Sequence, residues 1–70
     1  MYKAYQNRVI DEKNDLDGKI ERLVVFLSVE EMAEHKETTP DEKEKLNRQI
    51  KIMKDYSQVL GERIAEFAVN

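Results

Sequence analysis

The chain has 70 residues, no cysteine, one histidine and a formal net charge of −3. Chains shorter than roughly 70–80 residues usually need disulfides, a metal or association with other copies to be stable. The lack of cysteine excludes disulfides and thiolate metal sites, and His35 as the only histidine excludes a multi-histidine site within one chain. Association is therefore predicted. The negative charge also argues against broad binding to duplex DNA or RNA, which depends on neutralising phosphates, but it leaves room for a small anionic ligand in a local basic pocket.

The first half of the sequence is predicted to be a helix over about residues 3–36. An apolar seam and a neighbouring stripe recur there at helical spacing, formed by Val9, Leu16, Ile20, Leu23 and Leu27 and by Val25, Val29 and Met32. The apolar run of residues 23–27 resembles a buried strand, but the surrounding charged pattern without turn signals favours a helix. Poor helix formers between Asn14 and Gly18 favour a kink or a weak turn there, and a short N-terminal helical piece around residues 2–7 could be angled against the rest.

Residues 37–39 form the predicted loop, because the only proline of the chain follows them. Thr39 is a favourable N-cap, Pro40 occupies the first helical position, and Glu42 lies three residues after the cap. This arrangement predicts a capping box with a proline where its missing N–H costs nothing. A second helix is therefore predicted over about residues 40–69.

The second helix carries an apolar seam with alternating spacings of four and three residues, which is typical of left-handed coiled-coil packing. Its members are Leu46, Ile50, Met53, Ser57, Leu60, Ile64 and Phe67, and only the serine interrupts the apolar pattern. A second stripe runs beside it through Ile52, Tyr56, Val59 and Arg63. One stripe suffices for a hairpin, so two stripes imply partners on two sides. We therefore expect an all-α fold with one domain over residues 1–70, an antiparallel two-helix hairpin that assembles into a homo-oligomeric helical bundle.

No group of residues in the sequence predicts catalysis. The acidic residues alternate with lysine and arginine as on solvated helix faces, and the sequence has no phosphate-binding glycine loop, nucleophile turn or zinc-protease motif. His35 is expected to be a surface residue that assists the end of the first helix rather than a metal ligand. The sequence thus predicts no enzyme, no metal site and no cofactor. Without a stretch of roughly 18 apolar residues or a signal-peptide core, a cytoplasmic location without membrane contact is expected.

The N-terminal segment has both a structural and a functional interpretation. Tyr2 and Tyr5 lie three residues apart, with Lys3 and Arg8 beside them. Both rings could pack as amphipathic residues at the helix start. Alternatively, one ring could stack on a ligand base while a cation binds the phosphates of the ligand.

The two glycines leave a similar pair of alternatives open. A glycine inside a helix costs about 1 kcal/mol relative to alanine, so it usually has a reason. Gly61 allows either close helix packing or the approach of a ligand beside Arg63. Gly18 presents the same choice, with Lys19 and Arg22 as the nearby cations.

Three segments resemble a known family of small phage proteins. They are YQNRVIDEK at residues 5–13, LDGKIERL at residues 16–23 and YSQVLGERI at residues 56–64. In this order they resemble the helical-hairpin family that includes the phage anti-CBASS cyclic-oligonucleotide sponge, and a related hairpin occurs in a phage anti-Thoeris sponge. The likeness covers nearly the whole chain apart from the region of residues 30–43.

The resemblance implies a homohexamer that captures immune second messengers without cleaving them, in the cytoplasm of an infected bacterial host, and so blocks the activation of CBASS effectors. It implies cyclic dinucleotides at protomer interfaces and, in family members, cyclic trinucleotides in separate pockets. The residues carried over are Tyr2 or Tyr5 for base stacking, Lys19 or Arg22 for phosphates, Arg63 for the trinucleotide, and Arg8 as a further contact. Gly18 departs from the lysine- or glutamate-like residue that the resemblance implies at this position.

Two other functions are compatible with the pattern. A structural or adaptor hairpin that binds another protein is the main alternative, and it predicts that Tyr5, Lys19 and Arg63 tolerate alanine without loss of activity. The sponge hypothesis predicts loss of ligand binding with the fold intact. A helical RNA binder comes third, because the net negative charge opposes it.

Overall fold

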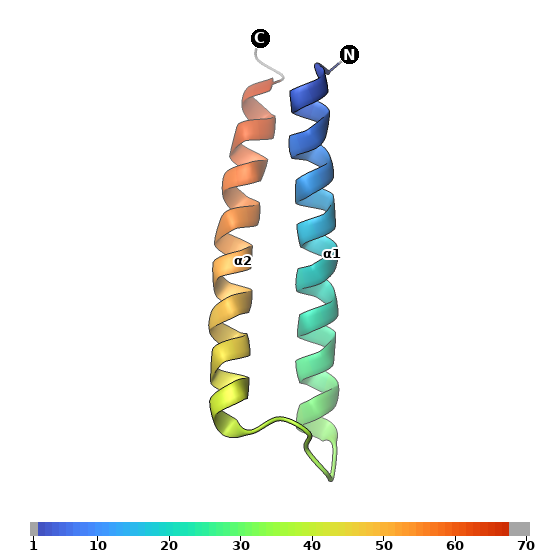
Figure 1. Ribbon diagram of the computed structural model, residues 1–70, viewed down its shortest axis with the longest axis vertical. Coiled ribbons are helices and arrows are strands. Elements are labelled where there is room, and N and C mark those ends of the chain that lie inside the picture. Colours follow the sequence, from blue (N-terminus) through green and yellow to red (C-terminus); the bar gives the residue numbers. More distant parts are fainter. Residues whose placement is uncertain (1, 68–70) are drawn as a thin grey trace.

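The chain forms an antiparallel pair of helices joined by one loop (Figure 1). In the computed structural model, which describes residues 2–67, helix α1 spans Ala4–Met32 and helix α2 spans Pro40–Phe67. The start of α1 and the end of α2 lie at one end of the molecule, and the loop closes the other. The molecule measures 52 × 16 × 14 Å, and its radius of gyration of 15.8 Å exceeds the value of about 11 Å expected for a globular chain of this length. The predicted all-helical hairpin is confirmed, and the described residues contain no strand.

Helix α1 is continuous through the segment in which the sequence predicts a kink. Asp17, within that segment, forms an ion pair with Lys13 one turn earlier, with a distance of 2.8 Å from Nζ to Oδ2. Such i, i+4 pairs stabilise a helix, which offsets the poor helix propensity of the segment. The short angled helix expected at the N-terminus is likewise not a separate element, because α1 begins at Ala4 and continues without a break to Met32.

Helix α1 ends at Met32, earlier than its predicted end near residue 36, so the loop covers residues 33–39. The backbone leaves the helix early because the buried side chain of Glu30 holds the returning loop. Its Oε1 accepts hydrogen bonds from the backbone N–H groups of Glu37 and Thr38, the second at 2.9 Å. A helical continuation through these residues would break both hydrogen bonds.

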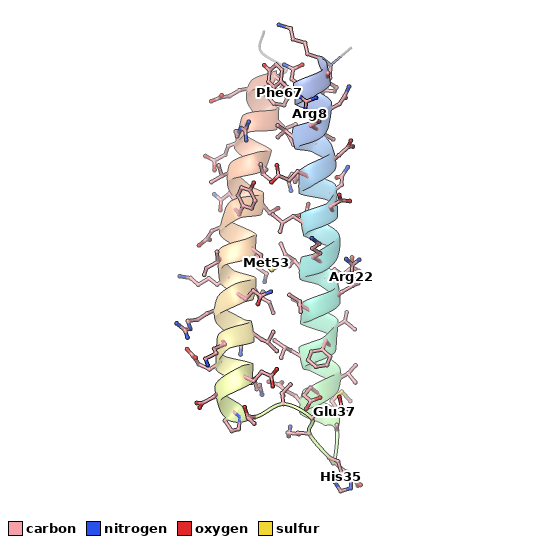
Figure 2. All side chains as sticks on the ribbon, viewed as in Figure 1. Arg8, Arg22, His35, Glu37, Met53 and Phe67 are labelled. Carbon is pink, nitrogen blue, oxygen red and sulfur yellow. The ribbon has the colours of Figure 1, made fainter. Side chains whose placement is uncertain are left out.

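Lys36, rather than His35, assists the C-terminus of α1. Its Nζ donates to the carbonyl oxygen of Glu31 at 3.1 Å, which satisfies one of the carbonyls left free at a helix end. His35 lies at the tip of the loop, away from that end of the helix (Figure 2). The Glu31 carboxylate also pairs with Lys43 of α2 at 2.6 Å, so this turn is tied to both helices.

The start of α2 has the predicted N-cap, but the described residues form only one of the two hydrogen bonds of the predicted capping box, because the Glu42 side chain does not accept one from the backbone N–H of Thr39. The backbone N–H of Glu42 donates to Thr39 Oγ1 at 3.1 Å, and the N–H of Lys43 donates to the carbonyl oxygen of Thr39 at 2.9 Å. Thr39 is therefore the N-cap and Pro40 the first helical residue, as expected. The end of this helix predicted near residue 69 lies outside the described residues.

The two helices meet along seams with alternating spacings of four and three residues. In α1, Lys13 fills the position between Val9 and Leu16 that the apolar pattern alone leaves empty. Met53 of α2 lies between the helices (Figure 2). Among residues 2–67, the buried hydrophobic side chains are Val9, Leu27, Ile50 and Leu60, of which Leu60 is fully buried. The core of a single hairpin is therefore thin.

Many large apolar side chains remain exposed on the hairpin. They include Val24, Val25, Phe26, Val29 and Met32 of α1 and Ile52, Tyr56 and Val59 of α2, with Met32 87% exposed. These residues lie on or beside the second stripes predicted from the sequence. A single hairpin thus leaves apolar faces uncovered on both helices.

Candidate ligand-binding groove

A groove on one side of the hairpin brings two predicted cations together with an aromatic ring. Its volume of about 500 Å³ lies in the range of pockets that hold small ligands. The lining residues are Arg8, Asp11, Glu12, Asp15, Leu16 and Lys19 of α1 and Tyr56 of α2. The α1 residues recur at spacings of three and four, so they belong to one face of that helix.

Tyr56 provides the aromatic surface of the groove. Its side chain is 45% exposed, and its hydroxyl donates a hydrogen bond to Glu12 Oε2 on the other helix. This hydrogen bond, together with partial burial and the charge of Glu12, raises the pKa of the Tyr56 hydroxyl above its usual 10.0, while the charge of Arg63 opposes the rise. The hydrogen bond connects the ring to the face of α1 that carries Arg8 and Lys19, where the exposed part of the ring offers a surface for stacking.

The two cations of the groove have no side-chain partner among the described residues. Among the described residues, neither Arg8 nor Lys19 forms an ion pair or a side-chain hydrogen bond, whereas Lys13, Lys43 and Arg48 each contact a carboxylate. Free cations beside an aromatic ring suit a ligand that has both a phosphate and a base. The groove also contains three carboxylates, which outnumber its two cations. A single hairpin therefore offers hydrogen-bond acceptors as well as anion-binding groups.

The structure places the N-terminal tyrosines outside this groove. The rings of Tyr2 and Tyr5 make edge contacts with Phe67, with ring centroids 6.4 and 5.9 Å apart. Arg8 and Phe67 lie at the same end of the hairpin (Figure 2). Within a single hairpin the two tyrosines therefore pack at the helix start, although both rings remain partly exposed.

The other predicted cations lie outside the lining of the groove. Arg22 extends from α1 away from α2 (Figure 2), and its guanidinium passes near Gly18. Arg63 lies on α2 two turns beyond Tyr56 and close enough to influence the pKa of its hydroxyl. Arg8 and Lys19 are therefore the two predicted site residues that share one groove.

Tyr56 and Leu16 line the groove, although the sequence pattern predicts them only as members of apolar stripes. The place of Tyr56 beside Arg8 and Lys19 follows from the alignment of the two helices, which the stripe pattern does not contain. The available signal was its position at the start of the segment 56–64, which resembles the phage sponges.

A polar layer lies in the helix contact next to the groove. Lys13 Nζ donates to Asp17 Oδ2 at 2.8 Å and to Ser57 Oγ at 3.0 Å, and Ser57 Oγ donates to Asp17 Oδ1. The hydrogen bond from Lys13, and then that from Ser57, lowers the pKa of the Asp17 carboxyl. A Cβ at Gly61 would lie 3.2 Å from Lys13 Cε, so close packing accounts for this glycine.

A second groove lies near the start of α2. It has a volume of about 490 Å³ and is lined by Pro40, Lys43, Glu44, Asn47, Arg48 and Lys51. Two of its cations already have partners, since Lys43 pairs with Glu31 and Arg48 pairs with Glu44. It also lacks an aromatic ring, so it is less suited to a nucleotide than the groove at Tyr56.

Within residues 2–67, no three His, Asp or Glu side chains are grouped as the ligands of a metal ion would be. No helix in this part of the chain is long and apolar enough to cross a membrane. The groove itself offers two cations, three carboxylates and one aromatic ring.

Comparison with known proteins identifies the family. The profile of the Sequestin family matches residues 3–66. Neither a search of curated proteins nor a search of solved structures gave a significant match. The family name indicates a sequestering role, that is, binding rather than catalysis. Because the match covers nearly the whole of the 70-residue chain, the protein belongs to the Sequestin family.

Proposed function

We propose that this protein is a phage sponge that sequesters cyclic oligonucleotide second messengers without cleaving them. Cyclic dinucleotides are the expected ligands, cyclic trinucleotides are a second class, and their capture in the cytoplasm of an infected bacterium keeps CBASS effectors inactive. The match to the Sequestin family over residues 3–66 carries the proposal. The resemblance of three sequence segments to cyclic-oligonucleotide sponges supports the choice of ligand.

The chemistry of the groove fits such a ligand. Arg8 and Lys19 have no partner within the described residues and provide donors for phosphate oxygens. Tyr56 provides a ring for base stacking. Asp11 and Asp15 provide acceptors for sugar hydroxyls and base amino groups. The groove therefore has a counterpart for each part of a cyclic nucleotide.

Association completes the proposed site. Because carboxylates outnumber cations in the groove of one hairpin, tight binding of an anion requires cations from another copy. The exposed apolar faces of both helices favour that association, and a homohexamer is the expected assembly. In this arrangement, Tyr2 or Tyr5, Arg22 and Arg63 contribute to pockets at protomer interfaces.

Isothermal titration tests the proposal directly. The purified protein is titrated with cyclic dinucleotides, cyclic trinucleotides and cyclic ADP-ribose isomers, and the ligand is recovered by denaturing the complex. We expect submicromolar binding at a fraction of a site per chain and recovery of intact ligand. A folded, oligomeric protein that releases no heat with any ligand would refute the proposal, and recovery of a cleaved ligand would indicate an enzyme.

Variants of the groove locate the site. Arg8→Ala and Lys19→Ala each remove one charge-assisted hydrogen bond, so we expect affinity to fall roughly tenfold or more in each. Lys45→Ala is the matched control, because it removes an exposed lysine of α2 outside the groove. Circular dichroism checks that all three variants remain helical. Equal affinities in the three variants would place the ligand elsewhere on the protein.

The exposed apolar faces also favour an alternative function as an adaptor hairpin that binds another protein. Val25, Val29 and Met32 are exposed on α1, and a partner helix could cover them. In that case Arg8→Ala and Lys19→Ala should leave activity unchanged. A charged substitution such as Val29→Asp would then abolish activity, and added cyclic nucleotides would not change the activity of either protein.

A further inference from the structure

The contact between the helices is interrupted by one polar position in the middle of each seam. In α1 the position is Lys13, between Val9 and Leu16, and in α2 it is Ser57, between Met53 and Leu60. These two positions face each other, with Lys13 Nζ 3.0 Å from Ser57 Oγ. Two interruptions that coincide across a contact satisfy each other's hydrogen bonds.

The hydrogen bonds of this polar layer are complete. Asp17 accepts one hydrogen bond from Lys13 at 2.8 Å and another from Ser57. Ser57 is only 7% exposed, so water does not substitute freely for these partners. Among the described residues, no buried side-chain nitrogen or oxygen lacks a hydrogen-bond partner. The layer is therefore compatible with this alignment of the helices at little cost.

The apolar parts of the seams do not define one alignment. A spacing of four and three repeats every seven residues, so a shift of roughly 10 Å along the helix axis brings equivalent positions opposite each other. After such a shift Met53 takes the place of Leu60, and both are apolar. The polar layer removes this equivalence, because a shifted alignment takes Ser57, which is buried here, away from both Lys13 and Asp17.

The glycine of α2 belongs to the same arrangement. A Cβ at position 61 would lie 3.2 Å from Lys13 Cε, so the lysine stem passes closely over Gly61 on its way to Ser57. A shift of α2 by one heptad would place a side chain under this stem. Packing and hydrogen bonding therefore select the same register.

We infer that the polar layer of Lys13, Asp17 and Ser57 sets the register of α1 against α2 and thereby positions the two walls of the groove. Glu12 directly precedes Lys13, and Tyr56 directly precedes Ser57. The hydrogen bond between Glu12 and Tyr56 thus forms in the same alignment as the polar layer. The register is a property of the hairpin, whereas the effect on a nucleotide rests on the proposed function.

An apolar replacement of the layer tests this inference. The double variant Lys13→Leu/Ser57→Leu makes both seams continuous, and we expect it to fold with more than one register. In the wild type, the ring centroids of Tyr5 and Phe67 are 5.9 Å apart, so nuclear Overhauser effects are expected between the protons of the two rings. We expect the double variant to lose these signals or to show additional sets of amide resonances. Its affinity for cyclic dinucleotides should fall roughly ten- to hundredfold, the equivalent of one lost charge-assisted hydrogen bond.

Two further comparisons keep the test decisive. Met53→Leu changes the same seam without changing its polarity, so it should keep the wild-type spectrum and affinity. The near-isosteric pair Ser57→Thr and Ser57→Val differs chiefly in the hydroxyl, and it serves if the double variant does not fold. Ser57→Thr should preserve the ring contacts, and Ser57→Val should weaken them and lower the affinity.

The outcomes separate this inference from the proposed function. Wild-type ring contacts and a single set of resonances in Lys13→Leu/Ser57→Leu would overturn the inference, including when affinity falls, because the layer would then act on the ligand directly. A wild-type protein that binds no cyclic nucleotide would overturn the proposed function alone. The spectra of the variants would still decide the origin of the register.

Discussion

The two glycines inside the helices provide a matched pair of substitutions with different expected effects. Alanine is about 1 kcal/mol more favourable than glycine in a helix, provided that the added methyl group fits. At Gly18 the new Cβ would lie 3.4 Å from a guanidinium nitrogen of Arg22, which is the movable end of an exposed side chain. We therefore expect Gly18→Ala to increase the free energy of unfolding by about 1 kcal/mol and to raise the Tm by roughly 4–8 °C.

The same substitution at Gly61 meets a side chain that cannot move freely. The new Cβ would lie 3.2 Å from Lys13 Cε, closer than an ordinary van der Waals contact. Lys13 cannot swing away without losing its hydrogen bonds to Asp17 and Ser57. Overpacking of this kind typically costs about 1–3 kcal/mol, which cancels or exceeds the gain in helix propensity. We expect Gly61→Ala to change the free energy of unfolding by roughly 0 to −2 kcal/mol.

Urea unfolding followed by circular dichroism measures both effects, at one protein concentration because association adds to apparent stability. Repeating both substitutions in a Lys13→Ala background removes the stem above Gly61. In that background Gly61→Ala should gain about 1 kcal/mol, as Gly18→Ala does. If Gly61→Ala stabilised the wild-type protein as much as Gly18→Ala, the Lys13 stem would be free to move, and the account of close packing at this layer would be refuted.

Three further substitutions or titrations test individual contacts. Leu60→Ala removes the fully buried side chain of the core and should destabilise the hairpin by about 2–5 kcal/mol in urea unfolding; a smaller loss would mean that the core relaxes into the cavity. The pKa of the Glu30 carboxyl is lowered from 4.5, chiefly by the hydrogen bond from the backbone N–H of Thr38. The ionised carboxylate therefore stabilises the fold fully above pH 4.5, and this stabilisation is lost as the pH falls through the lower pKa of the folded state. Glu30→Gln should flatten the dependence of Tm on pH in this range. The hydrogen bond to Glu12 raises the pKa of the Tyr56 hydroxyl above 10.0. Glu12→Ala should therefore shift the ionisation of Tyr56 to lower pH in an absorbance titration, from which the signal of the other tyrosines is subtracted with Tyr56→Phe. An unchanged titration curve would contradict the contact.

The fold was predictable because its determinants are local. Thr39 and Pro40 define the start of α2 through contacts within one turn, and the structure has the expected cap. The end of α1 was not predictable in this way, since Glu30 acts on the backbone of residues 37–38, across the loop. The helical pattern of the sequence continues to residue 36, and it does not reveal that loop hydrogen bonds to Glu30 replace the helical ones there.

The groove was predictable only on the α1 side. Arg8 and Lys19 are eleven residues apart, which is close to three helical turns, so they lie on one face wherever α1 is helical. Tyr56 joins them across the helix pair, and its place depends on the register of α2 rather than on its own helix. The N-terminal tyrosines illustrate the same limit, because their contact with Phe67 connects opposite ends of the sequence.

The interruptions of the seams contain the register information that the apolar residues lack. Ser57 appears in the sequence as a defect in a regular stripe, and Lys13 appears as a charged residue between two seam positions. If both are treated as members of their seams, antiparallel pairing about a short loop brings them near each other, and only then do their hydrogen bonds find partners. A buried polar residue without a partner costs more than an apolar replacement would, so two coincident interruptions are mutually stabilising in one alignment and unfavourable in every other. The same polar residues that weaken a helix contact in isolation therefore specify which contact forms.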